Sequence, residues 1–280
     1  MRLVYLGTPD MAVPTLRALV DAGHDVALVV TAKDKRRGRG VALVPSPVKA
    51  AAIELGLPVT DRIDDILELD PLPELGVVVA FGRLIKPHVF DAVPMINVHF
   101  SLLPRWRGAA PLERAILAGD EKTGVCVMAI EESLDTGAVF RSAEVPIDPD
   151  ATADELRAVL VDLGTALVLD TLQQGLGEPT PQVGEPVYAS KLDPSEHEID
   201  WSRPAIELHR LVRIGDAWTT HNGKRLKVWR TALPAGNGVV VPTGSEPLEL
   251  VEVQPEGKGR MPAHAWANGA HFHSGDRLGT

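Results

Sequence analysis

Short apolar runs of strand length alternate with helical segments through the first half of this 280-residue chain. The run at residues 77–81, Val-Val-Val-Ala-Phe, contains no polar residue, which is typical of a strand buried on both faces of a sheet. Other strands are predicted at 2–6, 26–31, 96–99 and 125–130, and helices at 10–22 and 46–55. This alternation predicts an α/β fold with a mostly parallel sheet covered on both faces, whose ligands bind at the carboxyl ends of the strands.

The pattern changes after about residue 176, where proline and glycine become frequent and the composition is that of a linker. A short helix is predicted next at residues 205–213. Short β-like runs separated by turn residues follow it and predict a small β-barrel or sheet. We therefore expect an N-terminal domain at residues 1–180, a linker at 181–203 and a C-terminal domain at 204–280.

The composition excludes several classes of protein. An apolar fraction of 45% is too high for a disordered chain, and no run approaches the roughly 18 to 20 apolar residues of a membrane helix. The apolar N-terminus is interrupted at Thr8-Pro9-Asp10, so we expect no signal peptide. Cys126 is the only cysteine, which excludes an internal disulfide and a cysteine-based metal site. We expect a cytoplasmic protein.

The net charge of −10 argues against nucleic acid as a partner, but basic residues are concentrated in two segments. Residues 203–230 contain seven Lys and Arg against two acidic residues, and residues 33–40 contain five cations. Either segment is suited to phosphates, although a solvated loop and a solvated face account for the charge equally well.

Sequence motifs for common cofactors are missing. Gly7-Thr8-Pro9-Asp10 follows the first strand, but it lacks the G-x-G-x-x-G pattern, and Pro9 removes an amide that a pyrophosphate needs. A nicotinamide or flavin enzyme is therefore disfavoured. There is no P-loop and no H-x-x-x-H pair, and we expect no metal.

Polar residues at the end of the predicted strand 96–99 are candidates for catalysis. Asn97 and His99 point to one face because the side-chain period of a strand is two. An amide and an imidazole placed side by side can hydrogen-bond a developing oxyanion. Asp135, in a turn after a later strand, is suited to orienting the imidazole or accepting a proton through water. Taken singly, each is more typical of a buried polar residue or a turn residue than of a catalytic one.

The joint occurrence of these residues resembles the 10-formyltetrahydrofolate-dependent formyltransferases. The motifs that carry the resemblance are N-V-H-x-S-L-L-P-R-W-R-G-A-A-P (97–111) and L-D-T-G (134–137). Others are G-T-P-D (7–10), R-G-R-G (37–40), P-S-P-V-K (45–49), I-D-W-S (199–202), K-R-L-K-V-W-R (224–230) and Q-P-E-G-K (254–258). Together they cover nearly the whole chain, and they are most similar to the branch of the family that acts on methionyl-tRNA.

The resemblance assigns roles to residues of this chain. Asn97, His99 and Asp135 match the catalytic trio of the family. The expected folate-binding residues are Ser101, Leu102, Leu103, Pro104, Ala80, Phe81, Gly82, Leu84 and Ile85. The expected tRNA-binding residues are Lys35, Arg36, Arg37 and Arg39 in a loop and Lys224, Arg225 and Lys227 in the C-terminal domain. The fold implied is a Rossmann-like formyltransferase domain with an abbreviated, OB-like C-terminal β-barrel.

The activity implied is transfer of the formyl group from 10-formyltetrahydrofolate to the α-amino group of methionyl initiator tRNA. Asn97 and a protonated or Nε2–H His99 stabilise the oxyanion, and Asp135 holds His99 and helps remove the amine proton. No metal and no membrane are required, and a monomer is expected.

Three other functions use the same residues. They are formyl transfer to an amino-sugar nucleotide or another small amine, hydrolysis of the formyl-folate, and a folate- or RNA-binding module without turnover. Three features depart from the family pattern: the bulky Phe100 in the catalytic motif, the shortened C-terminal domain, and Met11 and Phe81 at positions where Phe and Tyr are common. The ring of Phe100 either narrows the site or turns into the core.

Overall fold

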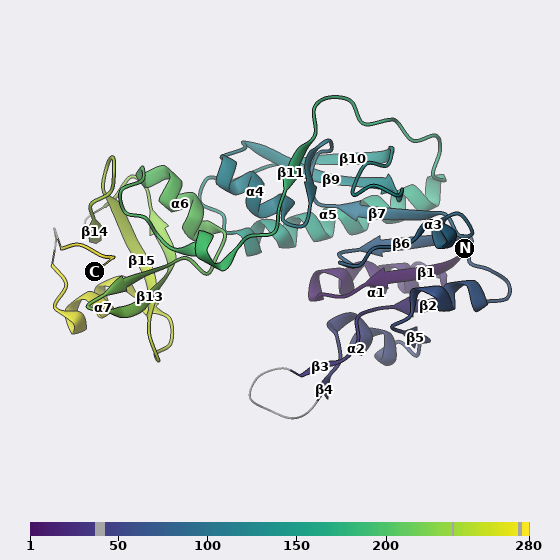
Figure 1. Cartoon of the computed structure of the whole chain (residues 1–280), viewed down its shortest axis with the longest axis horizontal. Coiled ribbons are helices and arrows are strands. Elements are labelled where there is room, and N and C mark those ends of the chain that lie inside the picture. Colours follow the sequence, from purple (N-terminus) through teal and green to yellow (C-terminus); the bar gives the residue numbers. More distant parts are fainter. Residues whose placement is uncertain (37–42, 237, 274–275, 280) are drawn as a thin grey trace. The chain divides into compact units, whose positions relative to one another are not determined.

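The computed structural model describes residues 1–280 except 37–42, 237, 274–275 and 280. The chain divides into two compact units (Figure 1). The first unit comprises Met1–Pro111, Lys122–Val145 and Arg157–Ser190, and the second comprises Leu112–Glu121, Pro146–Leu156 and Lys191–Thr280. Residues 181–203, expected to form a linker, are divided between these units, and the bounds 1–180, 181–203 and 204–280 remain a prediction.

The first unit is built on a seven-stranded sheet. Its strands are β1 (Arg2–Gly7), β2 (Asp25–Val30), β5 (Val59–Thr60), β6 (Leu75–Val79), β7 (Met95–His99), β9 (Lys122–Ala129) and β10 (Val139–Pro146). They lie in the order β10-β9-β7-β6-β1-β2-β5, parallel from β7 to β5, whereas β9 runs antiparallel to β7. The predicted α/β class with a mostly parallel sheet is confirmed. The apolar run at 77–81 supplies the interior strand β6, which ends at Val79.

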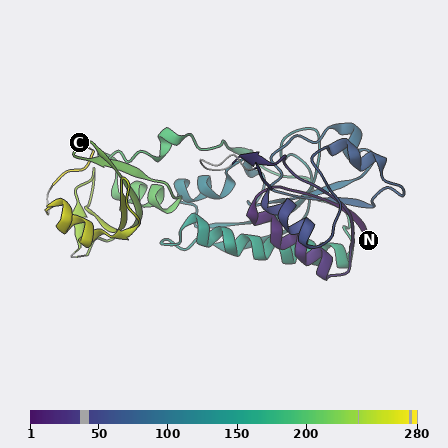
Figure 2. The same ribbon diagram turned by 90° about the horizontal axis from the view of Figure 1, so that it is seen from below.

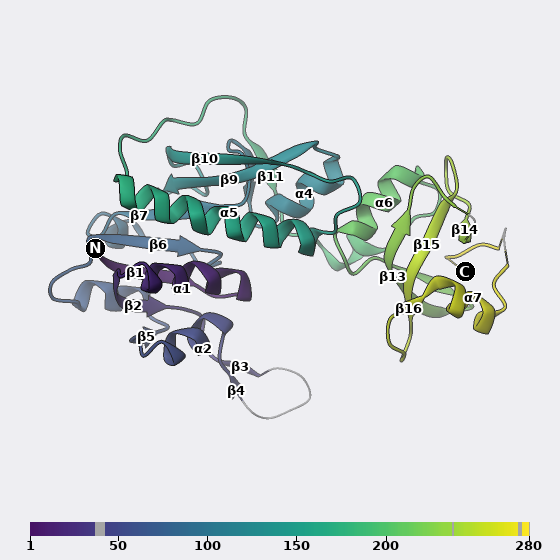
Figure 3. The ribbon, with the colours of Figure 1, turned by 180° about the vertical axis from the view of Figure 1, so that it is seen from behind.

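Helices cover both faces of this sheet. The helices before the C-terminal segment are α1 (Val13–Asp21), α2 (Pro47–Glu54), α3 (Pro87–Phe90), α4 (Pro111–Ala118) and α5 (Ala153–Gln174), with 3-10 turns at Asp10–Ala12, Ile63–Glu68 and Pro194–His197. Figures 2 and 3 show α1 and α5 side by side on one face, where the hydroxyls of Thr15 and Thr165 lie 2.8 Å apart. On the other face a buried cluster joins β1, β2 and β6 to the Ile63–Glu68 turn and α3.

Two short ribbons complete the first unit. The antiparallel pair β3 (Lys35–Arg36) and β4 (Leu43–Val44) flanks part of the predicted basic loop. The parallel pair β8 (Arg105–Gly108) and β11 (Val187–Ala189) lies beyond the end of β7 in the sequence. Residues 187–189, expected to lie in a linker, are therefore paired with the segment that carries the catalytic motif.

The second unit holds a five-stranded antiparallel sheet. Its elements are α6 (Ala205–Arg213), β12 (Trp218–His221), β13 (Lys224–Ala232), β14 (Val239–Val241), β15 (Leu248–Pro255), β16 (Met261–Pro262) and α7 (Ala263–Ala270). Along β13, Leu226 and Val228 are buried on one face, whereas Arg225 is exposed and Lys227 is half-buried on the other, so the strand presents a polar outer face. The predicted small C-terminal β domain is confirmed as an antiparallel sheet, and its OB-like closure remains a prediction.

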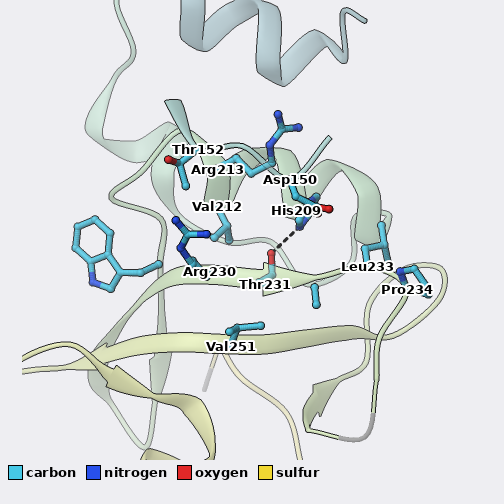
Figure 4. Close-up of a pocket in the computed structure, with 12 residues that line it drawn as sticks. Asp150, Thr152, His209, Val212, Arg213, Arg230, Thr231, Leu233, Pro234 and Val251 are labelled. Atoms are coloured by element: carbon cyan, nitrogen blue, oxygen red, sulfur yellow. Dashed lines mark hydrogen bonds and ion pairs between the residues drawn. The ribbon is translucent and has the colours of Figure 1, made fainter. Parts of the chain in front are cut away.

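A cavity of about 250 Å³ lies in the second unit between α6 and strands β13 and β15 (Figure 4). His209, which is 4% exposed, bridges its walls: Nδ1 lies 2.8 Å from the Thr231 hydroxyl and Nε2 lies 3.2 Å from the Pro149 carbonyl. Arg213 donates to the carbonyls of Ala151 and Asp148. Two buried side chains of α6 therefore hold the segment that precedes α5.

This arrangement predicts a pH-dependent stability. Burial lowers the pKa of His209, reinforced by the charge of Arg213 and opposed by the Pro149 carbonyl and Asp150. The unfolded chain then binds the proton more readily than the folded one, so stability is lost as the pH falls below the unfolded pKa of about 6.5. A His209→Gln variant is expected to lose less of its free energy of unfolding than the wild type between neutral and mildly acidic pH. Urea unfolding at several pH values measures this, and equal losses would contradict it.

Candidate active site

Strand β7 places Asn97 and His99 on one face, at the carboxyl end of the parallel part of the sheet. Opposite them on β9 lie Met128 and Cys126. Asn97 is half-buried, and His99 is 5% exposed, so the imidazole is largely shielded from water. These positions follow from the strand register expected from the sequence.

A turn after β9 brings Asp135 to the same place. Asp135 has a left-handed backbone (φ 52°), and Gly137 passes so close to β9 that a Cβ there would meet the Ala129 carbonyl oxygen at 1.9 Å. The Asp135 carboxylate, 11% exposed, lies with Oδ2 3.6 Å from His99 Nδ1 and accepts a hydrogen bond of 2.8 Å from the Gly108 amide. The structure thus brings Asp135 to His99, and it places Asn97 on the same face of β7 as His99.

The hydrogen bonds of His99 indicate where its protons lie. Nε2 is 2.9 Å from the Trp106 carbonyl oxygen, and because a carbonyl only accepts, Nε2 carries a hydrogen as the ring is placed. When the ring is also protonated at Nδ1, that proton faces the Asp135 carboxylate. This Nε2 hydrogen is expected from the sequence to stabilise an oxyanion, but here it is directed at the Trp106 carbonyl. It can reach substrate only if the hydrogen bond to Trp106 is replaced by one to the substrate oxygen.

The segment predicted to bind folate after β7 is tightly held. The buried hydroxyl of Ser101 donates to the Arg105 carbonyl at 2.6 Å, so this side chain serves the fold of the loop. The ring of Phe100 is 8% exposed and lies 3.6 Å from the position of a Cβ on Gly164 of α5. Phe100 therefore turns into the core and does not narrow the site. Leu102, Leu103 and Pro104 are half-buried.

The second predicted folate segment, residues 80–85, has both buried and exposed side chains. Phe81 and Ile85 belong to the buried cluster on the β1, β2 and β6 strands, so they reach a ligand only through their backbone. Ala80 and Gly82 both have left-handed backbones (φ 46° and 70°). The side chains that face solvent in this segment are those of Arg83 and Leu84, and Leu84 is 75% exposed.

Gln182 is a polar contact of this site that the sequence did not single out. Its Nε2 donates to the carbonyls of Asp135 (2.9 Å) and Gly137 (2.8 Å). Its Oε1 accepts two hydrogen bonds from Arg107. The residue lies in the proline- and glycine-rich segment expected to be a linker, and no sequence signal distinguishes it there.

The predicted tRNA-binding residues divide into two groups. Lys35 and Arg36 are exposed on β3, whereas Arg37 and Arg39 lie outside the described residues. Lys224 and Arg225 are exposed on β13, and the Lys227 ammonium forms an ion pair of 2.6 Å with Asp216.

Cations and indole rings meet on the outer face of β13. The Arg225 guanidinium lies 3.9 Å from the centroid of the Trp218 ring, and that of Arg260 lies 3.4 Å from the Trp229 ring. Lys227 lies 5.2 Å from Trp229. Arg260 was not among the predicted residues, because it lies outside the basic segment 203–230 and only the sheet brings it beside Trp229. We call Arg225, Lys227, Arg260, Trp218 and Trp229 the basic-aromatic face.

Two further observations concern metals and membranes. The described part of the chain holds no group of three or more His, Cys, Asp or Glu side chains placed to bind a metal ion. Nor does any helix in that part combine the length and apolar character needed to cross a bilayer.

Two family models match most of this chain. Residues 1–172 match the formyl transferase family and residues 191–271 match the formyl transferase C-terminal domain. Methionyl-tRNA formyltransferase of Symbiobacterium thermophilum is 41% identical over 310 aligned positions, covering 99% of this chain and 95% of the relative. That of Cutibacterium acnes is 44% identical, covering 99% of this chain and 100% of the relative.

A solved structure shares the fold at low sequence identity. The N-formyltransferase of Helicobacter canadensis, in complex with folinic acid and dTDP-3-aminofucose, superposes with a TM-score of 0.69 at 19% identity. The match covers 89% of this chain and 98% of that one. From the two family matches and the full-length relatives, the chain belongs to the formyl transferase family, in the company of the methionyl-tRNA formyltransferases.

Proposed function

We propose that this chain transfers the formyl group of 10-formyltetrahydrofolate to the α-amino group of methionyl initiator tRNA. The observation that carries the proposal is the convergence of Asn97, His99 and Asp135 at the end of β7. The full-length similarity to methionyl-tRNA formyltransferases supports the choice of acceptor. In this proposal the enzyme acts in the cytoplasm as a monomer, without a metal.

The proposed reaction forms a bond between the α-amino nitrogen and the formyl carbon, and breaks the bond between that carbon and N10 of the folate. Negative charge develops on the formyl oxygen, and the Asn97 amide supplies a hydrogen-bond donor for it; the Nε2–H of His99 supplies a second once it exchanges the Trp106 carbonyl for this oxygen. Asp135 accepts the proton of the attacking amine, directly or through water, and a proton returns to N10 as it leaves.

The proposed folate site lies along the backbone of residues 80–85 and 101–104. Because Phe81 and Ile85 are buried, their peptide groups rather than their rings and methyls are available. The exposed Leu84 supplies apolar surface, and Leu102, Leu103 and Pro104 supply a half-buried wall. Such a site, apolar with a few backbone donors and acceptors, suits the flat ring of a folate.

The basic-aromatic face is the proposed contact with the tRNA backbone. Arg225 and Arg260 lie over indole rings, and neither forms an ion pair with a described residue. Their guanidinium edges are therefore available for phosphates. Lys227 is partly neutralised by Asp216, so it contributes less than the sequence suggests. Lys35, Arg36, Arg37 and Arg39 are proposed as a second, separate contact with the tRNA.

An Arg225→Ala/Arg260→Ala double variant is expected to raise KM for methionyl-tRNA while leaving KM for the folate unchanged. Each lost phosphate contact reduces the slope of log affinity against log salt by about one. Filter binding of the tRNA over a series of salt concentrations measures both effects. Arg203→Ala is the matched control, since Arg203 is already paired with Glu207 at 2.6 Å. An unchanged salt slope in the double variant would remove this face from the tRNA interface.

Analysis of the reaction products distinguishes the proposed activity from the three other functions. An amino-sugar formyltransferase has no use for the basic-aromatic face, and the likeness to the Helicobacter canadensis structure, at 19% identity, concerns the fold alone. A formyl-folate hydrolase uses water in place of the amine as the nucleophile. A binding module does not use Asn97, His99 and Asp135 for catalysis.

The test supplies purified protein and 10-formyltetrahydrofolate with methionyl initiator tRNA, uncharged tRNA or a dTDP-linked amino sugar. We expect formyl-methionyl-tRNA from the charged tRNA and no formylated product from the other two. Free formate as the main product, or faster formylation of the sugar, would replace the proposal with the corresponding alternative.

A further inference from the structure

We propose that Gln182 is a positioning residue that fixes the turn carrying Asp135 in its catalytic place; this inference rests on the function proposed above. Gln182 lies two residues after Thr180, whose backbone forms two hydrogen bonds of 2.8 Å with Val139 at the start of β10. Its neighbours Pro181 and Val183 are exposed, whereas Gln182 itself is half-buried and directed into the first unit.

Every hydrogen-bonding position of the Gln182 amide is occupied. The two N–H groups serve the carbonyls of Asp135 and Gly137, at 2.9 and 2.8 Å. The oxygen accepts from Nε and Nη2 of Arg107, at 3.0 and 2.6 Å. A primary amide offers two donors and one oxygen with two lone pairs, so the side chain is saturated. A glutamine side chain in a solvated linker keeps its rotamer freedom and is not expected to form such a set of hydrogen bonds.

The four hydrogen bonds of the Gln182 side chain connect the turn that carries Asp135 to strand β8. Arg107 and Gly108 are consecutive on β8, and the Gly108 amide binds the Asp135 carboxylate while Arg107 binds Gln182. Asp135 is thus tied to β8 through its side chain and, by way of Gln182, through its backbone. The turn needs this second tie because its tip is open to water, with Leu134 63% exposed, and because Asp135 has a left-handed backbone.

The consequence concerns the contact between Asp135 and His99. The separation of 3.6 Å between Oδ2 and Nδ1 depends on where the turn sits relative to β7. Without Gln182, the turn is linked to β8 by the hydrogen bond from the Gly108 amide to the Asp135 carboxylate alone. The backbone of the turn can then shift relative to β7. Misplacement of a catalytic group by about 1 Å can reduce a rate by about 100-fold. Gln182 is therefore expected to act on kcat, through Asp135, rather than on substrate binding.

Two substitutions separate the donor and acceptor halves of the amide. Gln182→Met keeps the length of the side chain and removes all four bonds. Gln182→Glu keeps the oxygen that pairs with Arg107 but cannot donate to the carbonyls of Asp135 and Gly137. We expect both variants to lower kcat by roughly 10- to 100-fold with KM for tRNA and folate nearly unchanged. Full activity in Gln182→Glu would overturn the inference, because the ties to the turn would then be dispensable.

A double-mutant cycle tests whether Gln182 acts through Asp135. Adding Gln182→Met to an Asp135→Asn protein is expected to lower kcat less than about two-fold further, since the group it positions is already lost. Additive losses would overturn the inference. Gln174→Met is the matched control, because Gln174 also accepts from an arginine, Arg141 at 2.9 Å, away from the trio.

Amide hydrogen exchange of residues 131–138 gives a readout that does not depend on which substrate accepts the formyl group. Faster exchange there in Gln182→Met, with an unchanged melting temperature, supports the positioning role, and unchanged exchange contradicts it. A wild-type protein that fails to formylate methionyl-tRNA would instead refute the proposed function. An active wild type with a fully active Gln182→Met variant would refute this inference alone.

Discussion

An Asn97→Ala variant is expected to transfer formyl groups roughly 100- to 1,000-fold more slowly than the wild type, the loss typical of removing one oxyanion donor. Asn97 lies on a short strand between two others, so its backbone is fixed before substrate arrives. The Asn97 amide donates its hydrogen bond when negative charge develops on the formyl oxygen. The loss should therefore appear in kcat, with KM for both substrates little changed.

Steady-state kinetics with methionyl initiator tRNA measures this effect. Asn268→Ala is the control, because Asn268 is exposed on α7 in the other unit. The melting temperatures of both variants should match that of the wild type. Turnover of Asn97→Ala within a few-fold of the wild type would show that the amide does not stabilise the transition state.

The second large effect is expected for Asp135→Asn, with a fall in kcat on the order of 100- to 10,000-fold, the range for losing a general base. The amide keeps the shape of the side chain and can still accept from the Gly108 amide. It lacks the negative charge that faces His99 Nδ1 at 3.6 Å and cannot take up the proton of the amine. Geometry is thus preserved while proton transfer to the carboxylate is lost.

A remote pair provides the matched control for this substitution. His88 and Asp64 lie 2.9 Å apart on the surface, so Asp64→Asn removes a carboxylate from a histidine without touching the trio. Its kcat should equal that of the wild type. A small effect of Asp135→Asn, comparable to that of Asp64→Asn, would mean that Asp135 is only a turn residue.

The fold was predictable where the side-chain pattern has a simple period. Strands β1, β2, β6, β7 and β9 and helix α6 lie where apolar runs or helix signals indicate them. Helix α5 was not predicted, although it is 22 residues long. Its buried residues, such as Leu160, Gly164 and Val168, follow helical spacing, but Val159 is apolar and 51% exposed. Apolar residues on several sides of the helix conceal the period that would identify it.

The candidate site was predictable in its residue types but not in its contacts. The period of two in β7 places Asn97 beside His99, yet only the tertiary fold brings Asp135 to within 3.6 Å of the imidazole. Charge counts identify a basic segment, but they do not show that Lys227 pairs with Asp216 or that Arg260 stacks on Trp229. Gln182 escaped notice because a single glutamine among prolines and glycines carries no pattern, whereas its four hydrogen bonds do.

The central claim is that this chain formylates methionyl-tRNA by means of Asn97 and Asp135. A single-turnover experiment tests it most directly: enzyme preloaded with 10-formyltetrahydrofolate is mixed with methionyl initiator tRNA, and formyl-methionyl-tRNA and formate are followed in time. We expect stoichiometric formyl-methionyl-tRNA from the wild type, and the same product formed at least about 100-fold more slowly by Asn97→Ala and Asp135→Asn. Formate in place of formyl-methionyl-tRNA, or equal rates in the three proteins, would contradict it.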